Sequence, residues 1–338
     1  MQDHLLSSLP PNFMPIKISN ISRTERFSYL MILLLLVLVA TLHLATPFIT
    51  VLFSYLVLKT VCWRGKKWLG ILVFVVLCAG LFTGFGYFVR QASKELPEIV
   101  SDAIPRVVEY ADQHKIDLPF SDMDSLKSVT MDTVKGAISS VGNFAKLATK
   151  EFVFLIMALV IAIGVFINPE ISRSDEEGGG SSNLYFHLAS ALSERFSSLY
   201  HCFEQVMYAQ LTISAINTVL TAIFVFSCSV KYAGLVVVLT FMFGLLPIVG
   251  NIISNSIIVG IAFTSSPGLA VSAIIFLVVI HKLEYFLNSK IIGDRIRHPM
   301  WLMLLSLIIG EHLMGIPGII LAPVLLSFIK IELSRFEV

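Results

Sequence analysis

The sequence predicts an all-α, polytopic transmembrane protein with two re-entrant or broken helical hairpins in its C-terminal half. Three observations support this fold class. Hydrophobic residues make up 56% of the 338 residues and charged residues only 14%, which is more apolar surface than a soluble core of this length needs. Several apolar runs reach the length of about 20 residues that a helix needs to cross a bilayer. Two of the longest runs are interrupted by proline and glycine.

The first half of the chain is predicted to contain four membrane spans. Residues 27–63 form an apolar run that is too long for one pass, so we expect two helices with a break near His43–Pro47. A third span is expected at about 68–89 and a fourth at about 151–167. These four helices would return the chain to the side of the membrane on which it began.

Polar and basic segments between the spans predict the domain organisation. Cytoplasmic loops are enriched in Lys and Arg, and the cluster Arg64, Lys66 and Lys67 therefore predicts that both termini are cytoplasmic, in a bacterial inner membrane. We expect five parts: an N-terminal cytoplasmic segment with three spans at 1–90, an amphipathic extracytoplasmic helical segment at 91–149, the fourth span at 150–168, a cytoplasmic linker with an amphipathic helix at 169–205, and a C-terminal core at 206–338.

The C-terminal core contains two over-long apolar segments, each interrupted near its centre. Residues 232–263 are interrupted around Pro247 and Gly250, and residues 301–331 around the run Gly315-Ile-Pro317-Gly318. Proline removes a backbone donor, and glycine permits a sharp bend. We therefore expect each segment to fold back on itself as a hairpin.

Each predicted hairpin follows a single span, one at about 206–230 and the other at about 269–286. The two units would cross the membrane in opposite directions, as an inverted repeat. Inverted repeats with discontinuous helices recur in transporters, because their half-helix ends bring dipoles and free backbone groups to the bilayer midplane. The pattern favours a solute site at the hairpin tips. An alternative, in which proline and glycine only kink ordinary helices, stays open.

Short polar side chains mark the first hairpin and the span before it. Asn251 and Asn255 fall on one side of the predicted second arm, with Ser254 between them, where they could bind a hydroxylated solute or a cation. Gln210 and Asn217 are seven residues apart, on one face of the preceding span. Hydrogen bonds and packing between helices are the alternative roles for all of these residues.

Ionisable residues mark the second break. Glu311 and His312 lie beside it, and an ionisable group at lipid depth needs a partner or a water-filled cavity. Coupling to a proton or a cation is one interpretation, and a hydrated hairpin tip is the other. By contrast, we expect Lys282 and Glu284 to anchor their span at the interface. The predicted pathway residues are Pro247, Gly250, Asn251, Asn255, Gln210, Asn217, Glu311, His312, Gly315, Pro317 and Gly318.

The stretch NSKIIGDRIRHPMWLMLLSLIIGEHLMGIPGIILAPVLLSFIK, from Asn288 to Lys330, resembles the closing signature of the autoinducer-2 exporter family of permeases. The stretch LLPIVGNI, from Leu245 to Ile252, resembles an earlier motif of that family. The resemblance covers most of the chain, and its most specific part is the last hundred residues or so. Residues that match the family pattern are Pro247, Gly250, Lys290, Gly293, Gly310, Gly315, Gly318 and Pro323, while His298 and Pro317 lie outside it.

This resemblance implies a small-molecule transporter of the inner membrane, driven by the proton-motive force or another ion gradient. It also implies a homo-oligomer, with a pentamer as one such assembly. Family members are linked to export of the quorum-sensing signal autoinducer-2 and to sodium/proton antiport. Three functions therefore stay open for this chain: a solute permease or exporter, a sodium/proton antiporter, and a membrane scaffold that transports nothing.

Composition and motifs argue against other classes of protein. The net charge is only +1 and no Lys/Arg-rich block is present, so nucleic acid is not an expected partner. The four cysteines lack metal-binding spacing, and no HExxH, GxSxG or P-loop motif indicates an enzyme. We expect no cofactor. The expected partners are a solute or an ion, with H⁺ or Na⁺ as the coupling ion, and the lipid bilayer.

Overall fold

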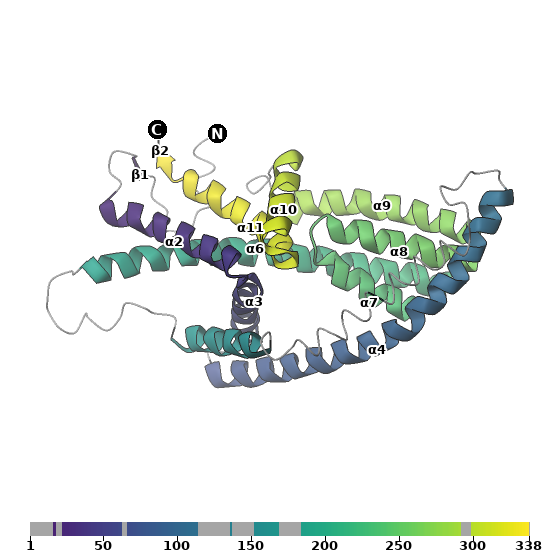
Figure 1. Cartoon of the computed structure of the whole chain (residues 1–338), viewed down its shortest axis with the longest axis horizontal. Coiled ribbons are helices and arrows are strands. Elements are labelled where there is room, and N and C mark those ends of the chain that lie inside the picture. Colours follow the sequence, from purple (N-terminus) through teal and green to yellow (C-terminus); the bar gives the residue numbers. More distant parts are fainter. Residues whose placement is uncertain are drawn as a thin grey trace. The chain divides into compact units, whose positions relative to one another are not determined.

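The computed structural model describes residues 16–17, 22–62, 66–113, 136, 152–168, 184–291 and 299–337, and almost all of these are helical (Figure 1). The chain forms two compact units. Unit 1 comprises Met1–Phe74, Phe154–Tyr208 and Ile292–Val338, and unit 2 comprises Val75–Val153 and Ala209–Ile291. The C-terminal core that the sequence predicts is therefore divided between the two units near residue 292.

Unit 1 is built from helices that come from three parts of the sequence. In chain order these are α2 (Arg23–Thr41), α3 (Ala45–Val61), the start of α4 (Lys67–Gln113), an unlabelled helix (Phe152–Ile167), the first part of α6 (Leu184–Ser227), α10 (Met300–Met314) and α11 (Ile316–Leu333). The two-residue strands β1 (Ile16–Lys17) and β2 (Phe336–Glu337) pair in parallel. This pairing places the two ends of the chain side by side.

Local sequence signals explain where α2 begins and ends. At its start, the Ser22 hydroxyl accepts a hydrogen bond from the Glu25 backbone N–H at 3.1 Å, and the Glu25 carboxylate accepts one from the Ser22 N–H at 2.8 Å. This reciprocal capping box satisfies two of the N–H groups that a helix start leaves free. At its end, His43 takes a positive φ of 55° before α3 begins. The predicted break near His43–Pro47 is confirmed.

The core of unit 1 is apolar except for one buried group of charges. Helices α2, α3, α6 and α11 contribute the apolar side chains, which include Ile32, Ile49, Leu56, Leu199, Phe203, Leu321 and Phe328. Beside them, Glu332 accepts hydrogen bonds from Tyr29 at 2.7 Å, from Arg195 at 3.0 Å and from Arg335 at 3.2 Å. Arg195 also lies 4.4 Å from the centre of the Tyr29 ring. These contacts join α2, α6 and the C-terminal end of α11.

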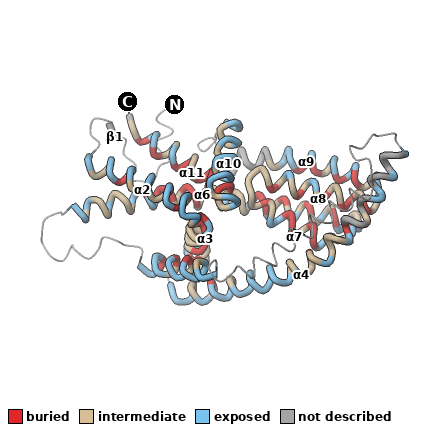
Figure 2. Tube along the Cα trace, viewed as in Figure 1, coloured by how far each residue is buried: buried red, intermediate tan, exposed pale blue. Residues whose placement is uncertain are grey.

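Unit 2 is a bundle in which α7 (Ala233–Gly244), α8 (Val249–Ser265) and α9 (Pro267–Ile291) lie side by side (Figure 1). The second parts of α4 and α6 complete it. Its core is almost entirely aliphatic and includes Val225, Val236, Ile258, Ile261, Ala273 and Leu277. Phe224 of α6 and Phe276 of α9 stack with ring centroids 4.3 Å apart. The buried residues therefore lie where the helices face one another (Figure 2).

Both predicted helix breaks are confirmed. The first apolar segment divides into α7 and α8, and the second into α10 and α11. At the first break, the Val249 N–H donates to the Pro247 carbonyl at 2.6 Å and Ile248 has φ 62° and ψ −58°. This is the strained form of γ-turn, which is rare for any residue and especially unfavourable for a β-branched one. At the second break, Gly315 takes a φ of 64°.

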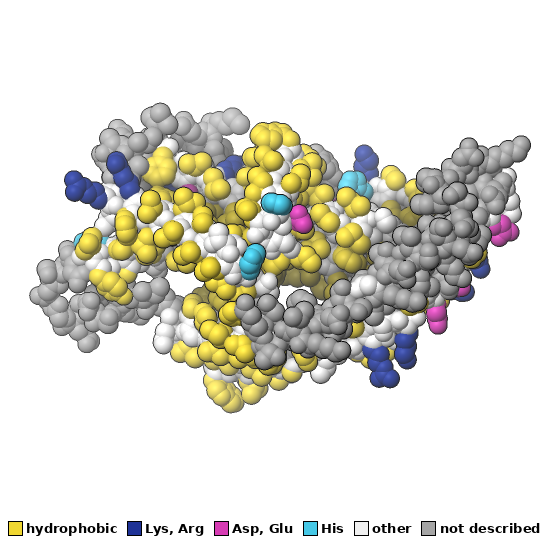
Figure 3. Space-filling model, in the orientation of Figure 1, with side chains coloured by type: hydrophobic (Ala, Val, Ile, Leu, Met, Phe, Trp, Pro, Cys, Tyr) yellow, Lys and Arg dark blue, Asp and Glu magenta, His cyan; other side chains and the backbone are white. Residues whose placement is uncertain are grey.

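Exposed apolar surface identifies the chain as a multi-pass membrane protein. Among the described residues, five helices are long and apolar enough to cross a membrane, judged by length and composition: Arg23–Thr41, Lys67–Ile99, Leu184–Ser227, Pro267–Glu284 and Ile316–Leu333. Large hydrophobic side chains such as Leu81, at 73% exposure, point outward along these helices. They dominate the described surface in the space-filling view (Figure 3). Such a surface is stable against lipid and unfavourable in water.

Two helices are longer than the sequence predicts. The third span continues without a break into the polar segment, so that α4 reaches Gln113 with Pro97 and Pro105 inside it. Likewise, the amphipathic helix and the fifth span form the single 44-residue helix α6. Apart from Gly136, the remainder of the predicted outer segment lies outside the described residues, as do residues 169–183 of the predicted linker, Gly293 and His298.

Polar contacts join segments that the sequence places on the same side of the membrane. In unit 1, the Lys67 ammonium donates to the Ile167 carbonyl at 2.7 Å, and both positions are predicted to be cytoplasmic. In unit 2, Arg106 donates to the Ser265 carbonyl at 2.9 Å, and Tyr232 donates to Glu98 at 3.4 Å, at the end predicted to be extracytoplasmic. Burial, assisted by the nearby carboxylates, raises the pKa of Tyr232 and keeps its hydroxyl neutral as a donor.

Candidate functional site

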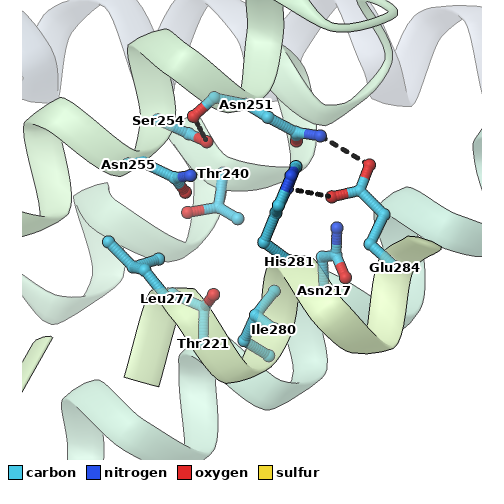
Figure 4. Close-up of a pocket in the computed structure, with 10 residues that line it drawn as sticks. All are labelled: Asn217, Thr221, Thr240, Asn251, Ser254, Asn255, Leu277, Ile280, His281 and Glu284. Atoms are coloured by element: carbon cyan, nitrogen blue, oxygen red, sulfur yellow. Dashed lines mark hydrogen bonds and ion pairs between the residues drawn. The ribbon is translucent and has the colours of Figure 1, made fainter. Parts of the chain in front are cut away.

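A polar pocket lies inside unit 2, among four helices that are otherwise apolar (Figure 4). The space open to the centre of a water molecule is about 10 Å³, which is room for about one water. Polar groups buried among apolar helices are costly unless they are paired or have a function. The residues that line the pocket are Asn217, Thr221, Thr240, Asn251, Ser254, Asn255, Leu277, Ile280, His281 and Glu284.

Helix α8 supplies three of the polar side chains. Asn251, Ser254 and Asn255 are spaced three and four residues apart, so a helix places them on one face. The start of α8 is fixed by Gly250, where a β-carbon would collide with the Phe243 carbonyl at the end of α7. The close packing of the two arms at this glycine therefore holds the Asn251 side chain at the pocket.

Helix α9 supplies the carboxylate of the pocket. Asn251 Nδ2 donates a hydrogen bond to Glu284 Oε1 at 2.5 Å, and the Glu284 side chain is only 12% exposed. His281 lies one turn earlier on the same helix, with its Nδ1 3.9 Å from Glu284 Oε2. The His281 side chain is 73% exposed. Among the pocket-lining residues, Glu284 and His281 are the two that can ionise.

Helices α6 and α7 supply the remaining polar side chains that line the pocket. Asn217 and Thr221 lie four residues apart on one face of α6, and Thr240 comes from α7. The Asn217 amide lines the same pocket as the Glu284 carboxylate. Its Oδ1 is buried and has no hydrogen-bond partner. The pocket therefore offers a free acceptor next to its one carboxylate.

The structure brings together three of the predicted pathway residues, Asn217, Asn251 and Asn255. Gln210, which the sequence places on the same face as Asn217, donates its Nε2 to the Gly244 carbonyl at 2.6 Å, a contact between helices that the sequence analysis names as the alternative role. The physical reason is that the end of α7 leaves carbonyl groups without a partner inside the helix. Pro247 lies in the turn between α7 and α8, outside the pocket lining.

The predicted residues at the second break lie in unit 1. Glu311 and His312 are exposed in the last turn of α10. Gly315 provides the positive φ between the two helices, and Pro317 occupies the first turn of α11. Gly318 is buried against Gly310, because a β-carbon on either glycine would collide with the carbonyl of the other. None of the pathway residues at this break lines the pocket of unit 2.

Glu284 is the main residue that sequence reasoning misjudged. We expected it to reach the interface beside Lys282, but its carboxylate turns inward to Asn251. The helical spacing of three between His281 and Glu284 and their position near the end of an apolar span were the available signals. Thr221 and Thr240 were also missed, because isolated threonines in an apolar helix give no pattern.

The chemistry of the pocket suits a small cation or a solute with hydrogen-bond donors. Its side chains offer one carboxylate, amide oxygens and hydroxyl oxygens, all of which can act as acceptors. No Lys or Arg is among the residues that line it. An acceptor-rich, acidic lining of this kind attracts positive charge and repels anions.

Comparison with known proteins gives two matches. The family model described as AI-2E family transporter matches residues 27–336 of the chain. The chain is also 31% identical over 121 residues to "Putative transport protein YdbI" of Bacillus subtilis (strain 168). That alignment covers 35% of this chain and 35% of the Bacillus protein, so it spans just over a third of either sequence.

Proposed function

The chain belongs to the AI-2E transporter family, and from this premise we propose that it moves a small polar solute across a bacterial inner membrane. The observation that best supports this proposal is the polar pocket of unit 2, enclosed by apolar helices and lined by Asn217, Asn251 and Glu284. A scaffold protein gains nothing from burying these groups at lipid depth, where they cost stability. A transporter needs them to replace the water that its solute loses on entry.

The break between α7 and α8 supports the same proposal. A strained γ-turn at Ile248 lies directly before the helix that carries Asn251 and Asn255. Strained backbone often marks segments that change conformation during function. The pocket has room for about one water, so a larger solute requires α8 to move. We propose that this hairpin rearranges to admit the solute, and that an H⁺ or Na⁺ gradient drives the movement.

The solute that we propose to test first is autoinducer-2, a small, hydroxylated signal molecule. The protein would be reconstituted into liposomes that are loaded with autoinducer-2, and efflux would be measured with and without a pH or sodium gradient. Wild-type protein is expected to release the signal faster when the gradient is present. An absence of gradient-dependent flux of both autoinducer-2 and sodium would contradict the proposed function.

A pair of serines on α8 provides a matched test of the pathway. Ser254 is buried in the pocket lining, whereas Ser256 is exposed on the other side of the helix. The methyl groups of Ser254→Val would fill a space that holds about one water, so we expect flux to fall about tenfold or more. Ser256→Val should leave flux close to that of the wild type. Equal flux in the two variants would place the pathway elsewhere.

The size of the pocket also favours a second candidate function, sodium/proton antiport. A space for about one water with a single carboxylate fits a dehydrated cation without any movement of α8. The same liposomes distinguish the two functions. Antiport predicts that sodium collapses a pH gradient in the absence of autoinducer-2, whereas solute export predicts that it does not.

A further inference from the structure

Glu284 is placed where an ionised carboxylate is costly. Its side chain is 12% exposed, inside a bundle whose described buried residues are apolar or polar but uncharged. Burial at lipid depth favours the uncharged form of a carboxyl group unless a fixed cation lies beside it. Among the described residues, His281 is the charge-bearing side chain that the structure pairs with Glu284. The uncharged form requires a proton.

The neighbours of Glu284 suit both of its protonation states. Asn251 Nδ2 donates to Glu284 Oε1 at 2.5 Å, and the Asn217 amide lines the same pocket. A guanidinium or ammonium group could only donate, which would hold the carboxylate ionised. An amide presents N–H groups to a carboxylate and, after a half-turn, its oxygen to a carboxylic acid. The buried and unpartnered Asn217 Oδ1 is an acceptor available for that role.

His281 connects this carboxyl group to the surface of unit 2. Its side chain is 73% exposed, and its Nδ1 lies 3.9 Å from Glu284 Oε2. This separation is too long for a hydrogen bond, but a small rotation of the ring or one bridging water would close it. Histidine is the side chain best suited to take up and release protons near neutral pH. The pocket itself has room for about one water.

Among the described residues that line the pocket, those from α6, α7 and α8 carry no charge. Asn217 and Thr221 of α6, Thr240 of α7 and Asn251 of α8 line the same pocket, and all four are neutral. Exchange of a proton with His281 is therefore the one change of charge that the residues lining this pocket can make. A gain or loss of charge at Glu284 alters the hydrogen bond that its carboxylate accepts from Asn251, and so the contact between α9 and α8.

We propose that Glu284 binds a proton inside unit 2 and that His281 transfers it to and from the surface. On loading, the Nδ1–H bond of the His281 imidazolium breaks, an O–H bond forms at Glu284 Oε2, and the imidazole becomes neutral. Release reverses these steps. The geometry of the pocket supports the proton-binding site. Only its role in coupling proton binding to solute transport rests on the proposed function.

Infrared difference spectroscopy of the full-length protein in lipid nanodiscs tests this proposal without any transport. A protonated buried carboxyl gives a C=O band that disappears as the pH is raised. We expect this band in the wild type, its loss in Glu284→Gln, and its presence in Glu109→Gln, which changes an exposed carboxylate of α4. A band that persists in Glu284→Gln, or that disappears in Glu311→Gln instead, would overturn the assignment.

Two further variants keep the test decisive if Glu284→Gln does not fold. Glu284→Asp retains a carboxyl group and should retain the band at a shifted frequency. His281→Gln should keep the band but slow its response to a pH jump about tenfold or more, because general acid–base transfer is removed. An unchanged response would exclude His281 as the relay.

The same band tests whether the site binds only protons. Sodium chloride would replace choline chloride at constant pH, and loss of the band on this exchange would overturn a proton-only site.

The outcomes also separate this inference from the proposed function. If the band is absent while autoinducer-2 flux depends on the gradient, the proton site is wrong and the transporter stands. If the band behaves as expected but no solute moves, the proton site stands and the proposed function fails.

Discussion

Glu332 has an unusual position at the scale of single residues. It is 4% exposed and accepts hydrogen bonds from two arginines, of which Arg195 is 1% and Arg335 is 4% exposed. Buried charges of this kind contribute little as intact pairs, because desolvation offsets the attraction. Removal of Glu332 is a different matter, since it leaves the two buried arginines with the half-exposed Glu194 as their remaining carboxylate partner. Unit 1 therefore depends on Glu332 more than on any exposed ion pair.

The substitution Glu332→Gln tests this dependence. We expect it to lower the free energy of unfolding by about 3 kcal/mol, the lower end of the range for a broken buried pair, because the two arginines then keep the half-exposed Glu194 as a carboxylate partner. Chemical denaturation in detergent micelles measures the change. As a control, Lys59→Gln breaks the Lys59–Glu204 pair, in which the lysine side chain is 50% exposed, and it should cost less than about 1 kcal/mol. Equal losses for the two variants would contradict this account.

Residue-scale prediction from sequence succeeds where a helix alone sets the geometry. Asn251 and Asn255 were expected on one helix face because their spacing of four fixes this, and both line the pocket. The role of Glu284 could not be read in the same way. Its partner Asn251 lies 33 residues away on another helix, and only the packing of α8 on α9 brings the two together.

At the scale of elements, glycine contacts set how closely the arms of each hairpin approach. Gly310 and Gly318 pack so tightly that a β-carbon on one would overlap the carbonyl of the other. The break itself could be predicted because Gly315 and Pro317 interrupt an apolar run. The continuity of helices α4 and α6 could not be predicted, because hydropathy indicates where a helix leaves the lipid and not where it ends.

The substitution Gly318→Ala should separate α10 from α11. We expect a loss of about 1–3 kcal/mol in the free energy of unfolding, which is typical of overpacking a buried contact. Gly260→Ala is the matched control, because no atom lies within 4 Å of the β-carbon that it adds to α8. That variant should be neutral or more stable by up to about 1 kcal/mol, since alanine is the better helix former. Thermal unfolding of both variants in detergent measures the difference. If Gly260→Ala is destabilised while Gly318→Ala is unaffected, this explanation is excluded.

At the scale of the whole molecule, the predicted passes through the membrane explain contacts that are distant in sequence. Lys67 reaches the end of the fourth predicted span, and Arg106 reaches the turn between α8 and α9, each on the side that the charge pattern assigns. Hydropathy predicts the spans, and the sidedness that the charge pattern assigns to them stays a prediction. The division into two units was not foreseeable, since unit 1 combines three separate parts of the chain.

Water access to the pocket from the two sides of the membrane is the most direct test of the claim that unit 2 holds a transport pathway. In a variant whose four native cysteines are replaced by alanine, Asn255→Cys and Ser256→Cys would be treated with a membrane-impermeant maleimide on either side of oriented vesicles. A pathway predicts that the pocket cysteine at 255 reacts and that its reaction blocks flux, while the exposed cysteine at 256 faces lipid and stays unreacted. If the cysteine at 255 is inert from both sides under conditions in which solute moves, the pocket is not on the route.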